Sequence, residues 1–70
     1  MNATYHPEII KTCRIFGCTP EQARAQYAAN AKQLRAGEAK ARALPNGRKF
    51  RGATADEWAE RAAKFEEIAA

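Results

Sequence analysis

Cys13 and Cys18 are the residues of this 70-residue chain whose chemistry stands out first. Two thiols at this spacing could form a disulfide, or could supply half of a tetrahedral zinc site. A zinc site needs four ligands, and the only histidine is His6, so the second half of such a site is missing. We therefore expect no metal and no other cofactor, and two free, partly buried thiols, as is usual in a reducing compartment.

Side chains that could catalyse a reaction are scarce. The chain has no serine, and its only aspartate, Asp56, lies where a helix is expected to start. The glutamates near the C-terminus could form acid pairs, but such pairs need a desolvated pocket that separates their pKa values. Of the hydrophobic residues, 17 are alanine, which leaves 15 larger ones. Because so few cannot enclose a deep pocket, we expect this protein not to be an enzyme.

The segment Gly47-Arg-Lys-Phe-Arg-Gly52 has the character of a loop that contacts an anion, since glycine lets backbone amides approach one. It lacks the Gly-Lys-Ser/Thr ending of nucleotide-binding loops. Arginine side chains around an aromatic ring are common at interfaces with proteins and with nucleic acids. We therefore interpret this segment as a contact loop for a macromolecule.

Helix start and stop signals divide the chain into three helices. A proline suited to a first helical position opens the first helix, and a glycine ends it. The sequences TPEQ at residues 19–22 and TADE at residues 54–57 each match a capping box, in which two side chains satisfy each other's backbone amides. We therefore expect helices over residues 7–16, 20–44 and 55–68.

The two longer helices are amphipathic, because their apolar residues recur at intervals of three and four. Joined by a short loop, they predict an antiparallel hairpin in an all-α chain that forms a single domain over residues 1–70. The short N-terminal helix is expected to fold across one end of this hairpin. At the hairpin interface we expect the following side chains to pack together: Trp58, Phe65, Tyr27, Leu34 and Leu44.

The long helix carries two further signals. Gly37 lies in its middle, where glycine costs about 1 kcal/mol relative to alanine, so we expect a close helix crossing or a local bend there. The long helix also extends beyond its shorter partner, which leaves apolar surface for the first helix or for another copy of the chain. We therefore expect a homodimer.

Positive charge is concentrated in residues 1–55, which hold ten Lys or Arg and three Glu, whereas residues 56–70 hold two Lys or Arg and five acids. The net charge of +4 favours neutral or anionic partners. No apolar run approaches the length of about 20 residues that spans a bilayer. The N-terminus also lacks the pattern of a signal peptide. We expect a soluble, cytoplasmic protein without a membrane partner.

A candidate partner-binding surface follows from where this charge lies. Between Lys32 and Arg51 there are seven Lys or Arg and one Glu, and the helical spacing of three and seven puts several of them on one face. An aromatic residue exposed at a loop tip beside arginines is a useful interface anchor. The ordinary alternative is a solvated face that keeps an alanine-rich protein soluble. The predicted partner-binding residues are Lys32, Arg35, Arg42, Arg48, Lys49, Phe50 and Arg51.

Residues 9–26 support an alternative function, because a helix, a turn at Gly17 and a new capped helix resemble a helix-turn-helix motif. In this interpretation the chain is a small DNA-binding regulator that uses residues 9–35. Two features weigh against it. Gln26 lies where such motifs bury an aliphatic residue, and Arg24 is the only basic residue on the outward face near the start of the second helix.

Two stretches carry a resemblance to a known group of proteins. They are YAANAKQLR at residues 27–35 and GRKFRGATADE at residues 47–57, followed by a charged, alanine-rich helix. Over residues 19–66 the chain resembles small helical accessory proteins of temperate tailed phages. Such proteins bind and disable a host component, such as a quorum-sensing regulator, a type IV pilus assembly factor or a defence complex. The resemblance implies a stoichiometric, non-catalytic inhibitor of a host protein in the host cytoplasm, and it assigns no individual residue.

Overall fold

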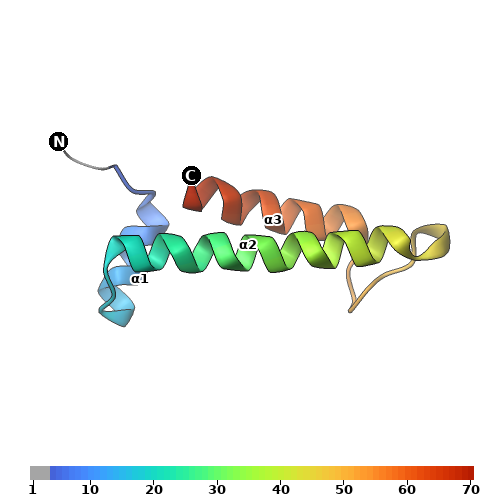
Figure 1. Ribbon diagram of the computed structural model, residues 1–70, viewed down its shortest axis with the longest axis horizontal. Coiled ribbons are helices and arrows are strands. Elements are labelled where there is room, and N and C mark those ends of the chain that lie inside the picture. The colour runs from blue at the N-terminus through green and yellow to red at the C-terminus, as the bar shows by residue number, and fades with distance from the viewer. Residues whose placement is uncertain (1–3) are drawn as a thin grey trace.

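The computed structural model describes residues 4–70 as three α-helices and one short 3-10 helix. Their bounds are α1 Pro7–Phe16, α2 Pro20–Ala43, η1 Pro45–Gly47 and α3 Ala55–Ala69. α2 and α3 lie antiparallel and side by side, and α1 crosses the N-terminal end of α2 (Figure 1). The predicted all-α hairpin with a short N-terminal helix is confirmed. Within residues 4–70, no helix has both the length and the apolar composition needed to cross a membrane.

Both predicted capping boxes are present and explain where α2 and α3 begin. The Gln22 N–H donates to the Thr19 hydroxyl at 3.2 Å, and the Thr19 N–H donates to the Gln22 side chain at 3.0 Å. Thr54 and Glu57 make the same pair of hydrogen bonds at 3.3 and 2.9 Å. Each box satisfies two backbone amides that the helix itself leaves without partners. The start of each helix is therefore fixed by four consecutive residues.

Small residues let α2 and α3 approach closely. The buried residues of these two helices are Ala23, Ala31, Gly37, Ala41 and Ala62. The Trp58 ring lies so close to Gly37 that a Cβ atom added to Gly37 would come within 2.8 to 3.0 Å of three of its carbons. The expected close helix crossing is therefore confirmed as the reason for a glycine in the middle of α2.

Larger side chains fill the interface on either side of this crossing. The rings of Tyr27 and Phe65 lie 5.4 Å apart at an angle of 54°, which is a favourable tilted arrangement. Leu34 and Trp58 line one surface hollow together with Phe65, as expected. Leu44, which we expected in the same group, lines a separate hollow at the loop end of the hairpin.

α1 is attached to the hairpin by a few specific contacts. Its start is capped by His6, whose ring accepts a hydrogen bond from the Glu8 N–H at 3.1 Å. Ile9 is fully buried, and it is the one large side chain that is so buried within the described part of the chain. The hydroxyl groups of Thr12 and Tyr27 lie 3.1 Å apart and share a hydrogen bond. These contacts place α1 against both longer helices.

α1 exposes three large apolar side chains. Ile15 and Phe16 are 64% and 76% exposed, and Ile10 is 39% exposed. Phe16 follows Ile9 by seven positions and so lies on the same side of the helix, yet of the two only Ile9 is fully buried. α1, which carries these exposed side chains, lies at the end of the molecule away from the connecting loop (Figure 1).

The contact between Trp58 and Gly37 leads to a test in which the effect of one substitution on stability changes sign between two backgrounds. Gly37→Ala should destabilise the protein by about 1–3 kcal/mol, because the added methyl group overpacks against the ring. In a Trp58→Ala background the same substitution should stabilise by about 1 kcal/mol, since only helix propensity remains. Urea unfolding of the four chains measures this, with trimethylamine N-oxide present to keep the weaker chains folded. A stabilising Gly37→Ala in the wild-type background contradicts the close contact.

Candidate functional site

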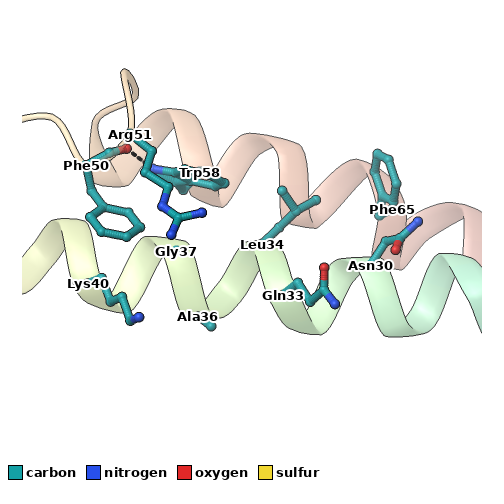
Figure 2. A pocket seen from close by; sticks show the side chains of 10 residues that line it. All are labelled: Asn30, Gln33, Leu34, Ala36, Gly37, Lys40, Phe50, Arg51, Trp58 and Phe65. Carbon is teal, nitrogen blue, oxygen red and sulfur yellow. Dashed lines mark hydrogen bonds between the residues drawn. The ribbon is translucent and has the colours of Figure 1, made fainter.

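α2, α3 and the loop between them line an open groove of about 500 Å³. Figure 2 shows its lining, with Trp58 and Phe65 contributed by α3 and the amide and alanine positions contributed by α2. We call it the α2/α3 groove. Its lining residues are Asn30, Gln33, Leu34, Ala36, Gly37, Lys40, Phe50, Arg51, Trp58 and Phe65.

A tight turn in the connecting loop positions two of these residues. The Phe50 N–H donates to the Ala53 carbonyl at 2.8 Å, and the Ala53 N–H donates to the Phe50 carbonyl at 3.2 Å. Between them Arg51 and Gly52 both have positive φ, 51° and 81°, as hairpin turns of the primed types require. This conformation is unfavourable for arginine by about 1–2 kcal/mol. The surrounding contacts must therefore hold Arg51 in place.

Trp58 fastens this turn to α3. Its indole N–H donates to the Phe50 carbonyl at 2.9 Å, and the two rings lie 6.1 Å apart at 46°. Phe50 is therefore half-buried, and the prediction of a freely exposed aromatic at the loop tip is wrong. The reason is that the loop turns back on itself at Arg51 and Gly52, which brings Phe50 against the helix.

Two cations flank the aromatic part of the groove. The Lys40 ammonium lies 5.7 Å from the centre of the Phe50 ring, and the Arg51 guanidinium lies 5.5 Å from it. Both distances fit cation–π contacts. The lining has no carboxylate, thiol, imidazole or hydroxyl group. The arrangement therefore suits the binding of an apolar ligand that carries negative charge.

Two of the basic side chains predicted to bind a partner from α2 instead form ion pairs with acidic side chains of the same chain. Arg35 makes two hydrogen bonds to Glu66, at 2.7 and 2.8 Å, and a third to Glu38 at 2.9 Å. Arg42 binds the other oxygen of Glu38 at 2.7 and 3.0 Å and approaches Asp56 at 3.8 Å. These residues therefore form an ion-pair network that joins α2 to α3. The sequence pattern does not predict this network.

The seven predicted partner-binding residues thus fall into separate places. Arg35 and Arg42 belong to the ion-pair network, while Phe50 and Arg51 line the α2/α3 groove. Lys32 and Arg48 line two other surface hollows, and Lys49 is exposed on the loop. Three pairs of them share surface hollows: Phe50 and Arg51 line the α2/α3 groove, Lys32 lies with Arg35 in a second hollow, and Arg42 lies with Arg48 in a third.

Sequence reasoning missed Lys40, Trp58 and Gln33 as members of this site. Lys40 follows Gly37 by three positions, so helical spacing alone places the two on one face. The apolar pattern assigns Trp58 entirely to the core, although its ring is only half-buried and lines the groove. Within residues 4–70, no group of three or more His, Cys, Asp or Glu is placed to hold a metal ion.

The ion-pair network has a clear electrostatic signature. The guanidinium of Arg35, and after it that of Arg42, holds the pKa of the Glu38 carboxyl below its ordinary value of 4.5. The Glu38 side chain is only 14% exposed. Arg35 lowers the pKa of Glu66 in the same way. Both carboxylates therefore remain charged in the folded chain at pH values where an unfolded chain begins to bind protons.

These depressed pKa values predict how stability changes in acid. A carboxyl group whose pKa is lowered by folding stabilises the fold above its unfolded pKa, and this contribution is lost as pH falls through the folded pKa. The Glu38→Gln variant should therefore be less stable than the wild type at neutral pH, and the two should converge at acidic pH, once the pH has fallen below the lowered pKa of Glu38. Thermal unfolding between these pH values measures the difference.

Glu67→Gln is the matched control, because Glu67 makes no ion pair within the described residues. Its stability should follow that of the wild type across the whole pH range. If the Glu38→Gln and wild-type profiles run parallel into acid, the network does not stabilise the fold.

Comparison with known proteins gives the chain no relative. No family model matches it, and neither a curated protein nor a solved structure does. The functional interpretation therefore depends on the geometry and charge of the α2/α3 groove.

Proposed function

We propose that this protein is a non-catalytic binding module that holds an acidic, amphipathic segment of another protein in the α2/α3 groove. The observation that carries the proposal is the pairing of two aromatic rings with two cations, Lys40 and Arg51, in a groove without acidic residues. A segment with apolar side chains would cover the rings of Phe50 and Trp58. Its carboxylates would lie beside the two cations.

The backbone of Arg51 supports a binding role for that side chain. A residue held in an unfavourable conformation often marks a functional position, because stability alone would favour a different residue. Arginine and tryptophan are also among the residues that contribute most to protein interfaces. In the α2/α3 groove, Arg51 lies in the tight turn, and Trp58 lies in α3 and donates the hydrogen bond that attaches the turn to this helix.

The resemblance to phage accessory proteins supports the choice of partner. On this basis the bound segment belongs to a host regulator, a pilus assembly factor or a defence complex, which the protein inhibits or redirects by stoichiometric binding in the host cytoplasm. The groove suits such a role, since it needs no cofactor and no chemistry. A compact acidic helix of a host protein is the occupant that its charge favours.

Peptide selection tests the groove before its natural partner is identified. A library of random peptides is sorted for binding to the labelled full-length chain, and we expect the selected peptides to combine Asp or Glu with large apolar residues. Trp58 is the only tryptophan of the chain, so a peptide in the groove should shift its fluorescence. The double variant Lys40→Glu, Arg51→Glu should weaken binding at least about tenfold, which corresponds to 1.4 kcal/mol.

The double variant Arg48→Glu, Lys49→Glu is the matched control, because it makes the same change in net charge at two loop residues outside the groove lining. Its affinity should stay close to that of the wild type. Equal losses in both double variants, or an unchanged Trp58 spectrum, contradict the proposed site. Charge reversal is used because Phe50→Ala would also remove a ring that packs on Trp58, and so would disturb folding.

Homodimer formation is a separate proposal, and two features of the fold support it. α2 has 24 residues against 15 in α3, and α1 exposes Ile15 and Phe16 beside the region where α2 begins. A second copy would cover this apolar surface. Sedimentation equilibrium at high micromolar concentration should detect a dimer, and Ile15→Ser with Phe16→Ser should return it to a monomer. A monomeric wild-type chain under these conditions contradicts the proposal.

The alternative function, a DNA-binding regulator that uses residues 9–35, draws on the turn between α1 and α2. The first turns of α2 carry a single cation, Arg24, whose guanidinium lies over the Tyr5 ring at 5.1 Å, and the acidic Glu21, which accepts from the Tyr5 hydroxyl at 3.0 Å. Affinity for duplex DNA would fall steeply with salt, with a slope near −0.9 for each phosphate contacted. Such a slope, together with an unchanged Trp58 spectrum, would favour this alternative over the groove.

A further inference from the structure

The α1–α2 junction brings the two cysteines of the chain together. The Cys18 and Cys13 sulfur atoms lie 4.0 Å apart, and both side chains are half-buried. We propose that Cys13 and Cys18 form a dithiol site that reacts with low-molecular-weight disulfides, such as oxidised glutathione, and closes into an intramolecular disulfide. This site lies at the opposite end of the hairpin from the connecting loop and is independent of the binding function proposed above (Figure 1).

The backbone explains why the two thiols meet. Gly17 ends α1 in the left-handed conformation, with a φ of 70°, and its N–H donates to the Cys13 carbonyl at 2.8 Å. This turn reverses the chain, so that Cys18 returns to the last turn of α1. The capping box of Thr19 begins α2 immediately afterwards, which fixes the other side of the junction. Both cysteines are therefore placed by helix ends rather than by a free loop.

Closure of the disulfide needs only a local movement. The sulfur atoms must approach from 4.0 Å to the bonded distance of about 2.0 Å. A shift of this size is within the range of side-chain rotation about rotamer positions. The helices that carry the two residues can keep their places.

The reaction proceeds by two thiol–disulfide exchanges. In the first, one protein thiolate attacks a sulfur of oxidised glutathione, which breaks the glutathione disulfide, forms a mixed disulfide and releases one reduced glutathione. In the second, the other protein thiolate attacks the mixed disulfide and releases another reduced glutathione. The protein loses two protons and two electrons, which together equal two hydrogen atoms, and one oxidised glutathione becomes two reduced molecules.

The surroundings of the two thiols suggest an order for these steps. Burial raises the pKa of the Cys13 thiol, and its hydrogen bond with Cys18 and the charges of Cys18 and Glu21 add to this effect. A thiol with a raised pKa is a poor first nucleophile, because a smaller fraction of it is present as the reactive thiolate. We therefore assign the first attack to Cys18 and the closing attack to Cys13.

Redox titration of the purified full-length chain tests the site. The reduced chain is equilibrated without oxygen in mixtures of reduced and oxidised glutathione. The mixture is quenched with acid and treated with N-ethylmaleimide, and the mass of the intact protein is measured by mass spectrometry. The expected product is a monomer that has lost two hydrogen atoms and carries neither glutathione nor maleimide. Its formation should be favoured at least about tenfold more in native buffer than in urea, because the fold that holds the thiols together is in turn stabilised by the disulfide.

Three variants keep the test specific. Cys13→Ser and Cys18→Ser should each stop at a single glutathione adduct. Gly17→Ala adds a methyl group that meets no atom within 4 Å, so its effect is limited to the strained backbone at positive φ, and it should reduce the advantage of native buffer over urea. Two glutathione adducts on the wild type, disulfides between chains, or equal disulfide formation in native buffer and urea would each overturn the proposal.

Discussion

The contact between the Trp58 ring and Gly37 is the interaction on which the rest of this structure depends. Only one large side chain is fully buried in the described chain, so the hairpin has no deep core of aliphatic residues. Trp58 supplies instead a single flat surface that α2 can approach closely because position 37 has no side chain. The same indole donates a hydrogen bond to Phe50, and so one residue joins both helices and the loop.

This dependence links stability to the candidate function. The indole lies against Gly37 and also lines the α2/α3 groove, and Phe50 is placed by the hydrogen bond that the indole donates. The groove is therefore built from the residues that close the hairpin rather than added to a finished scaffold. Positioning of this kind needs no extra hydrophobic core, which a chain of 70 residues does not have.

Local sequence signals make much of the fold predictable. Contacts between residues far apart in the sequence are not predictable in this way. Capping boxes at Thr19 and Thr54 lie within four residues, so the sequence alone indicates where both helices begin. Arg35 and Glu66 are 31 positions apart, and their pairing depends on the register of α2 against α3, which periodicity does not specify. The burial of Phe50 could not be predicted because it depends on positive φ at Arg51, a conformation that arginine rarely adopts.

The positive φ of Arg51 has a consequence for the course of evolution at this site. Glycine would adopt the same turn without the strain, so selection for a stable hairpin alone favours replacement of this arginine. An arginine that persists in descendants of this chain would therefore be maintained against that pressure. Under the proposed binding function, a change of Arg51 to glycine would mark a lineage that keeps the fold without the partner.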